Sequence, residues 1–196
     1  MLPTDTFFTD LEQTIQDFTE ADRPRLRKMI TELENIANRV PRVAERCYAY
    51  QARLFAKIQE YEQALAAVER AIQMAPMDNS LVILKGDIYR EAEEFSKALQ
   101  NYSQVVDEHP EAVTARIRRS DIHQASGDYQ KALEDINEAL KHEPRSLRLI
   151  YRRGLILVNL LRPNEAIADF RTVRQLSPEP ELKKKAQQRL RELGER

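Results

Sequence analysis

The sequence predicts an all-α fold: a solenoid of four 34-residue helical hairpins, with a pair of helices before them and a capping helix after them. Three observations support this prediction. Prolines recur every 34 residues, alanines recur in the same register, and the apolar residues between them follow a helical period. A chain of 196 residues is long enough for one short solenoid with end caps.

The repeat shows in several columns of equivalent residues. The aligned prolines are Pro76, Pro110, Pro144 and Pro178. The aligned alanines are Ala64, Ala98, Ala132 and Ala166. A column of small residues contains Ala52, Gly86, Ser120 and Gly154, and a bulky column contains Val68, Tyr102, Ile136 and Phe170. Because these columns share one register, we expect small residues where helices approach closely and bulky residues in the space between them.

Each period is predicted to hold two helices. Tyr61, Ala64 and Leu65 stand at the i, i+3 and i+4 positions of one helix face, and each aligned proline follows a second helix. Turn signals lie between the two helices of each period, at Gln59-Glu60, Glu93-Glu94, Gly127-Asp128 and Leu161-Arg162-Pro163. One period is therefore expected to be a helical hairpin with two apolar faces.

These features resemble the tetratricopeptide repeat family. The resemblance rests on the 34-residue period, on the spacing of the small, aromatic, alanine and proline columns, and on the run Asp128-Tyr129-Gln130-Lys131-Ala132-Leu133. It covers about residues 45 to 180, with repeats at about 45–78, 79–112, 113–146 and 147–180 inside a repeat region of 44–180. The resemblance implies a right-handed α-solenoid that acts as a scaffold for protein–protein interaction.

The third repeat departs from the pattern. Arg116 stands in a column that is otherwise apolar or aromatic, and His123 replaces the apolar residue of the other repeats. Arg116, Arg119 and His123 share one helix face. We expect their long stems to pack while their polar heads reach water, and the alternative is a contact with a partner.

The two ends are predicted to be caps. Residues 1–43 read as a helical hairpin that is either a degenerate repeat or a cap, with a start signal at Asp22 before Pro24. The alternative is that the acidic first helix, with Phe7 and Phe8 exposed, folds into the groove of its own or a neighbouring molecule. Residues 181–196 are expected to form a capping helix that ends near Gly194.

Composition favours a cytoplasmic protein. The formal net charge of −1 gives no general attraction to nucleic acids or anionic membranes. Cys47 is the only cysteine, as expected in a reducing compartment. The first 22 residues include six acidic residues and no basic one, unlike a secretory signal, and we expect no membrane insertion.

The residues that catalysis would need do not converge, so the sequence predicts that the protein is not an enzyme. His109, His123 and His142 lack the spacing of metal ligands, and we expect neither a metal nor a cofactor. The four glycines are scattered and form no phosphate-binding loop. Cys47 is interpreted as a small packing residue.

The binding surface is expected on the first helices of the repeats, which line the concave side of such a solenoid. The candidate peptide-binding residues are Tyr50, Arg53, Lys57, Ile83, Leu84, Asp87, Arg90, Ile117, Arg118, Asp121, Arg148, Tyr151 and Arg152. Arginine offers bidentate geometry to carboxylates, and the apolar residues can hold apolar side chains. The leading hypothesis is an adaptor that binds a peptide or helical segment of another protein, partly acidic in character. The competing interpretation is that these charges only keep the face hydrated.

Two other functions remain open at this point. A self-associating structural protein could join its acidic N-terminal end to the basic C-terminal end of the next molecule. RNA binding ranks third, because Tyr50 and Tyr151 are the only stacking side chains in the arginine row. The carboxylate clamp by which some family members hold chaperone tails is not matched, since Ile83 and Asp87 replace the lysine and asparagine it requires.

Overall fold

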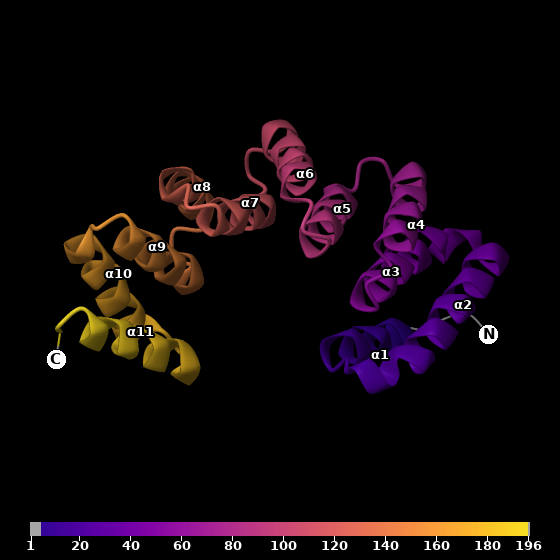
Figure 1. Ribbon diagram of the computed structural model, residues 1–196, viewed down its shortest axis with the longest axis horizontal. Helices are drawn as coiled ribbons and strands as arrows, with labels where there is room; N and C mark the ends of the chain where they lie inside the picture. The colour runs from indigo at the N-terminus through magenta and orange to yellow at the C-terminus, as the bar shows by residue number, and fades with distance from the viewer. Residues whose placement is uncertain (1–4, 196) are drawn as a thin grey trace. The chain divides into compact units, whose positions relative to one another are not determined.

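A computed structural model describes residues 5–195, and in this range the chain forms α-helices, two short 3-10 helices and no strands (Figure 1). The α-helices are α1 (Asp5–Gln16), α2 (Arg23–Arg39), α3 (Ala44–Lys57), α4 (Tyr61–Met74), α5 (Asn79–Glu91), α6 (Phe95–Glu108), α7 (Val113–Ala125), α8 (Tyr129–His142), α9 (Leu147–Asn159), α10 (Pro163–Leu176) and α11 (Pro180–Glu192). The 3-10 helices are η1 (Glu20–Asp22) and η2 (Pro41–Val43). From α2 to α5 and from α7 to α11, consecutive helices pack on one another as the sequence predicts, so the all-α hairpin-repeat fold is confirmed.

The chain divides into two compact units, one up to Asn101 and one from Tyr102. In the N-terminal unit, α2 packs on α3, α3 on α4, and α4 on α5. In the C-terminal unit, α7 packs on α8, α8 on α9, α9 on α10, and α10 on α11. Each unit is thus a stack of hairpins with its own apolar core.

The repeat columns account for these cores. All four aligned alanines and all four residues of the bulky column are fully buried. The small column provides close approach: a Cβ added to Gly154 would lie 2.7 Å from Cε1 of Phe170. Ser120, in the same column, donates a hydrogen bond from its buried hydroxyl to the carbonyl oxygen of Ala132 at 3.0 Å. The hydroxyl is therefore tolerated because it is paired.

The turn inside each hairpin has one residue in the left-handed conformation. These residues are Gln59, Glu93, Gly127 and Leu161, with φ of 63°, 61°, 82° and 56°. They are spaced by the repeat period and coincide with the predicted turn signals. Only one of them is glycine, so three of the four turns hold a side chain in a conformation that disfavours it.

The N-terminal helices lie close to where the sequence predicts them. Asp22 is the residue before α2, and Pro24 lies in the first turn of that helix, but the Asp22 carboxylate accepts hydrogen bonds from Thr19 and not from α2. The alternative interpretation described Phe7 and Phe8 as exposed, but in the structure Phe8 is buried against α3 and Phe7 is partly buried. The buried side of α1 also includes Leu11 and Ile15, which join the core formed by α2 and α3.

The last helix also matches its prediction. Ala186 and Leu190 of α11 are buried against the preceding hairpin. Gly194 follows the helix with φ of 85°, and the amide of Glu195 donates to the carbonyl oxygen of Leu190 at 2.9 Å. This is the helix stop that the sequence indicates at Gly194.

Candidate functional site

The C-terminal unit contains a groove between α7, α9 and α11, which we call the first-helix groove. Its main cavity has a volume of about 540 Å³, and a second cavity of about 470 Å³ adjoins it, because both are lined by Gln124 and Leu155. The main cavity is lined by Asp121, Gln124, Arg148, Tyr151, Arg152, Leu155, Glu179, Glu181, Leu182 and Lys185. Four of the predicted binding residues, Asp121, Arg148, Tyr151 and Arg152, therefore meet in one place.

Helical spacing explains why α9 contributes so many of these side chains. Arg148, Tyr151, Arg152 and Leu155 stand at i, i+3, i+4 and i+7, so they share one side of the helix. Leu149 and Ile156, each one residue after a groove residue, are buried in the core. Burial of the core face turns the other face toward the groove.

Most of the cations in the groove already have an acidic partner. Arg152 forms an ion pair with Asp121 of α7. Arg148 donates to Glu179 at the start of α11 through Nε and Nη2, at 3.2 and 3.1 Å. These pairs neutralise much of the basic character that the sequence predicts for this surface.

The side of the groove formed by α11 combines one further pair with an unpaired lysine. Hydrogen bonds to Tyr151 and Glu192 raise the pKa of Arg189. Lys185 is exposed, and within the described residues it forms no ion pair or hydrogen bond. Lys185 is therefore available to a carboxylate from outside the chain.

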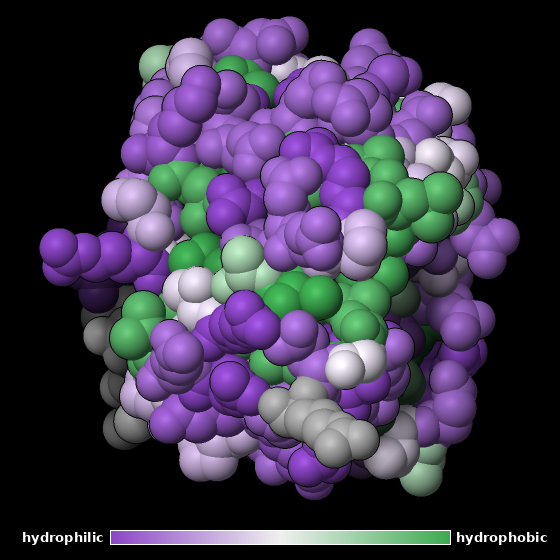
Figure 2. Space-filling view, turned by 90° about the vertical axis from the view of Figure 1, so that its left-hand side faces the viewer, coloured by the Kyte–Doolittle hydropathy of each residue, from purple (hydrophilic) through white to green (hydrophobic). Residues whose placement is uncertain are grey.

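Apolar side chains line the same groove. Tyr151, Leu155 and Leu182 are half-buried and pack against the core of the C-terminal unit. The ring of Tyr151 rests on Phe170, with ring centroids 5.5 Å apart. Each of these side chains keeps part of its apolar surface in solvent, where it can contact a ligand. On the face shown in Figure 2, apolar side chains are interspersed among hydrophilic ones.

In the N-terminal unit, α1 covers part of the predicted surface. Phe8 stacks on Tyr50, with ring centroids 5.2 Å apart, and the Tyr50 hydroxyl donates to Glu12 at 2.7 Å. Burial and this hydrogen bond raise the pKa of Tyr50. Arg53 forms an ion pair with Glu12 at 3.5 Å, while Lys57 is exposed at the end of α3. A ligand can reach Tyr50 only if α1 moves away.

The other predicted residues are half-buried and belong to different units. On α5 these are Ile83, Leu84, Asp87 and Arg90, and on α7 they are Ile117 and Arg118. Arg90 and Asp87 approach each other to 3.6 Å between Nη2 and Oδ1. Leu84 and Ile117 each pack against the core of their own unit, so part of their apolar surface serves the fold.

Two ion pairs with buried carboxylates repeat with the 34-residue period, and the sequence analysis did not predict them. Arg119 donates to both oxygens of Asp135, and Arg153 does the same to Asp169. Both acids are buried, and the hydrogen bonds raise the pKa of each arginine. The expectation that the head of Arg119 reaches water is therefore wrong. The equal spacing of the two pairs was the signal that could have revealed them.

The part of the chain that the structure describes offers no cluster of three or more His, Cys, Asp or Glu side chains that could hold a metal ion. Within the same residues, no helix combines the length and apolar character needed to cross a membrane. Cys47 is buried, and burial raises the pKa of its thiol to about 11. At neutral pH this cysteine is a protonated core residue and a poor nucleophile.

Comparison with protein families decides the classification. Two sequence models described as tetratricopeptide repeat match the chain, one at residues 120–191 and the other at 51–113 and 83–146. Together they span more than two thirds of the sequence. The chain belongs to the tetratricopeptide repeat family. Tetratricopeptide repeat proteins are scaffolds for protein interaction and are typically non-catalytic.

Solved tetratricopeptide repeat structures share the fold at low sequence identity. A tetratricopeptide repeat protein from Parabacteroides merdae has a TM-score of 0.65 and 20% identity, over 76% of this chain and 60% of its own. MamA from Desulfovibrio magneticus has a TM-score of 0.63 and 16% identity, over 85% and 95%. YrrB, described as having an unusual peptide-binding site, has a TM-score of 0.61 and 15% identity, over 86% of each chain. The search of curated proteins gave no match.

Proposed function

We propose that this tetratricopeptide repeat protein is a non-catalytic adaptor that binds a peptide or helical segment of another protein in the first-helix groove. The observation that carries the proposal is the meeting of half-exposed apolar side chains with an unpaired Lys185 in one groove, lined by three helices. Grooves of this kind hold a segment through apolar anchors and fix its position with a few polar contacts. The peptide-binding site described for YrrB agrees with this use of the fold.

The geometry also suggests the chemistry of the ligand. Tyr151, Leu155 and Leu182 would receive apolar side chains, and Lys185 would receive a carboxylate. Arg148 and Arg152 would not receive the carboxylate of the ligand, because Arg148 is already bound to Glu179 and Arg152 to Asp121. These two pairs instead hold α9 to the neighbouring helices that line the groove. We therefore propose a partly acidic segment that depends on one carboxylate and on apolar contacts, rather than a strongly acidic one.

The cellular setting is part of the proposal. The lone, buried Cys47 agrees with a reducing compartment, and we propose that the protein works in the cytoplasm. Neither a cofactor nor a metal is part of the proposed activity. The near-neutral net charge and the paired arginines argue against nucleic acid as the partner.

The groove can be tested with peptides selected from a displayed library against the full chain. Leu155→Glu places a charge among the apolar contacts, and Lys185→Glu reverses the unpaired cation. Matched controls are Leu161→Glu in an exposed turn and Lys184→Glu on the same helix as Lys185 but outside the groove. Selected peptides should bind both controls as tightly as the wild type and bind both groove variants at least about tenfold more weakly. Equal binding to groove and control variants would refute the proposal.

Reversal of the charge at position 152, by Arg152→Glu, is a weaker test of the groove. A glutamate at this position would face Asp121, the present partner of Arg152. Like charges at this distance destabilise the packing of α9 on α7, so lost binding could not be separated from lost structure. Lys185 avoids this problem, because it has no partner to lose.

A further inference from the structure

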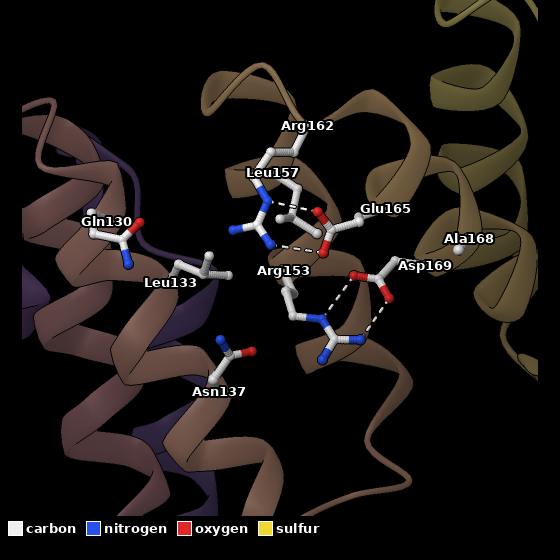
Figure 3. A pocket seen from close by; sticks show the side chains of 9 residues that line it. All are labelled: Gln130, Leu133, Asn137, Arg153, Leu157, Arg162, Glu165, Ala168 and Asp169. Atoms are coloured by element: carbon white, nitrogen blue, oxygen red, sulfur yellow. Dashed lines mark hydrogen bonds and ion pairs between the residues drawn. The ribbon is translucent and has the colours of Figure 1, made fainter.

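A separate cavity, of about 500 Å³, lies between α8, α9 and α10 on another side of the C-terminal unit from the first-helix groove, and we call it the α8–α10 cavity (Figure 3). Gln130, Leu133 and Asn137 of α8 form one wall. Arg153 of α9 and Arg162 of the following turn form the other (Figure 3). None of these residues lines the first-helix groove, so the two sites are separate.

Both arginines are held by a carboxylate through one edge of the guanidinium group. Arg153 donates from Nε and Nη2 to Asp169, at 2.9 and 2.7 Å. Arg162 donates in the same way to Glu165, at 2.6 and 2.8 Å. In each case the remaining nitrogen, Nη1, points away from the carboxylate (Figure 3). Within residues 5–195, neither Nη1 has a hydrogen-bond partner.

The preceding repeat shows what is missing at Arg153. Arg119 is bound to Asp135 by the same two bonds, at 2.9 and 2.6 Å, and its Nη1 also donates to the hydroxyl of Ser103 at 3.1 Å. The residue one period after Ser103 is Asn137, whose side chain forms no hydrogen bond within the described chain. Arg153 therefore lacks the hydrogen bond that its counterpart Arg119 makes to Ser103, and the α8–α10 cavity lies between Arg153 and Asn137.

We propose that the α8–α10 cavity binds the carboxylate of an aspartate or glutamate side chain from a partner polypeptide. The carboxylate accepts hydrogen bonds from Nη1 of Arg153 and of Arg162, and the Asn137 amide donates a further one. Glu165 and Asp169 line the cavity as well, but each arginine directs its remaining Nη1 away from its acid, and these two N–H groups favour an anionic oxygen over a neutral one. Leu133 and Leu157 provide apolar surface for the methylene groups of the ligand. The net charge of the lining is zero, so the cavity suits one carboxylate and not a run of acids.

The test follows the side-chain NMR signals of Arg153 and Arg162 in the full chain during titration with short blocked peptides. A peptide with one glutamate should shift both signals in a saturable way, with an affinity at least about tenfold higher than that of its glutamine analogue. Asn137→Asp places a carboxylate inside the cavity and should abolish the response. Asn137→Ser gives Arg153 a hydroxyl acceptor like the Ser103 hydroxyl that binds Arg119, and this substitution should weaken the response to the peptide. Lys185→Glu, which alters only the first-helix groove, should change nothing.

Several outcomes would overturn the proposal. They are equal responses to the glutamate and glutamine peptides, a full response in Asn137→Asp, and loss of the response in Lys185→Glu. Titration with free succinate distinguishes a carboxylate on a polypeptide from a carboxylate on a small molecule. Binding of succinate without binding of the peptide would assign the cavity to small molecules. Asn137 is exposed, so both substitutions should leave the helix content unchanged, and Asn137→Ser decides the question if Asn137→Asp does not fold.

Discussion

At the scale of single residues, three of the four hairpin turns place a residue other than glycine in the left-handed backbone conformation. Leu161 is 88% exposed and has φ of 56°, a conformation that favours glycine. Leu161→Gly should therefore raise the free energy of unfolding by about 1 kcal/mol, since the exposed side chain contributes no packing that would be lost. Urea denaturation followed by circular dichroism measures the change.

Gly127 is the matched control for Leu161. A Cβ at Gly127 meets no atom within 4 Å, so Gly127→Ala adds backbone strain without a steric clash. It should lower the free energy of unfolding by about 1 kcal/mol. Changes of the same sign in the two variants would contradict this account of the turns.

His123 makes the stability of the third repeat depend on pH. Its Nδ1 is buried and has no hydrogen-bond partner within the described residues, and burial lowers its pKa below the ordinary value. Asp135 and Asp128 oppose this shift, while Arg119 and Lys131 support it. The unfolded chain therefore takes up a proton at a higher pH than the folded chain, and stability should fall as the pH drops from about 7 to about 5.

Substitution of His123 by the residue of the next repeat isolates this effect. Leu157 occupies the equivalent position, so His123→Leu should remove part of the pH dependence while keeping the core filled. The measurement is the urea midpoint of both proteins at pH 7 and pH 5. Equal losses of stability on acidification would mean that other groups cause the pH dependence.

At the scale of helices, α1 is held by contacts that the repeat pattern did not reveal. Phe8 is 1% exposed, stacks on Tyr50 and lies under the guanidinium of Arg46 at 3.9 Å. We propose that α1 and α2 together cap the first repeat. Phe8→Ala should then lower the free energy of unfolding by roughly 3–5 kcal/mol, because it leaves a cavity between α1 and α3.

Phe7→Ala is the control for this helix, since Phe7 is only partly buried. Its cost in a thermal or urea denaturation should be clearly smaller than that of Phe8→Ala. Small, equal effects of both substitutions would show that α1 does not pack on α3 in solution.

The sequence predicted the hairpins well because each one is encoded locally. Turn residues such as Gly127, prolines after each second helix and the fully buried alanine column such as Ala98 repeat with a fixed period, so each helix boundary is supported several times. The packing of α1 could not be read in this way, because Phe8 belongs to no repeat column. Helix existence followed from a local pattern, while helix placement depended on contacts distant in sequence.

The candidate site was predicted only in part for a related reason. Asp121, Arg148, Tyr151 and Arg152 were placed on the correct helices, and the structure brings them together. The pairing of Arg152 with Asp121 and of Arg148 with Glu179 joins residues about one repeat apart, and it depends on how neighbouring hairpins pack. The contribution of α11 to the groove was not predicted, because that helix was interpreted as a cap or, in the alternative, as a self-association end.

At the scale of the whole molecule, stability and binding are properties of stacked hairpins. In such proteins each repeat is stabilised mainly by its neighbours, and a terminal element needs one polar face. On α11, Lys184 and Arg191 stand one period after Ile150 and Leu157, which pack inside the C-terminal unit. We propose that α11 caps this unit on one side while it forms a wall of the first-helix groove on the other.

The two proposed sites in the C-terminal unit would bind a carboxylate in different ways. The first-helix groove offers one unpaired lysine among apolar side chains, and the α8–α10 cavity offers the Nη1 groups of two arginines whose acidic partners, Glu165 and Asp169, line the same cavity. Self-association through the ends of the chain remains the alternative use of the molecule. Sedimentation at increasing concentration separates it from binding of another protein, because only self-association raises the mass of the free chain.

Hydrogen–deuterium exchange of the full chain, with and without a library-selected peptide, tests the central claim most directly. If the peptide binds in the first-helix groove, backbone amides of α7, α9 and α11 should exchange more slowly in the complex, and those of α2 and α4 should not change. Protection confined to α1–α5, or protection that persists at α9 and α11 in Lys185→Glu with unchanged affinity, would contradict the assignment of the binding site.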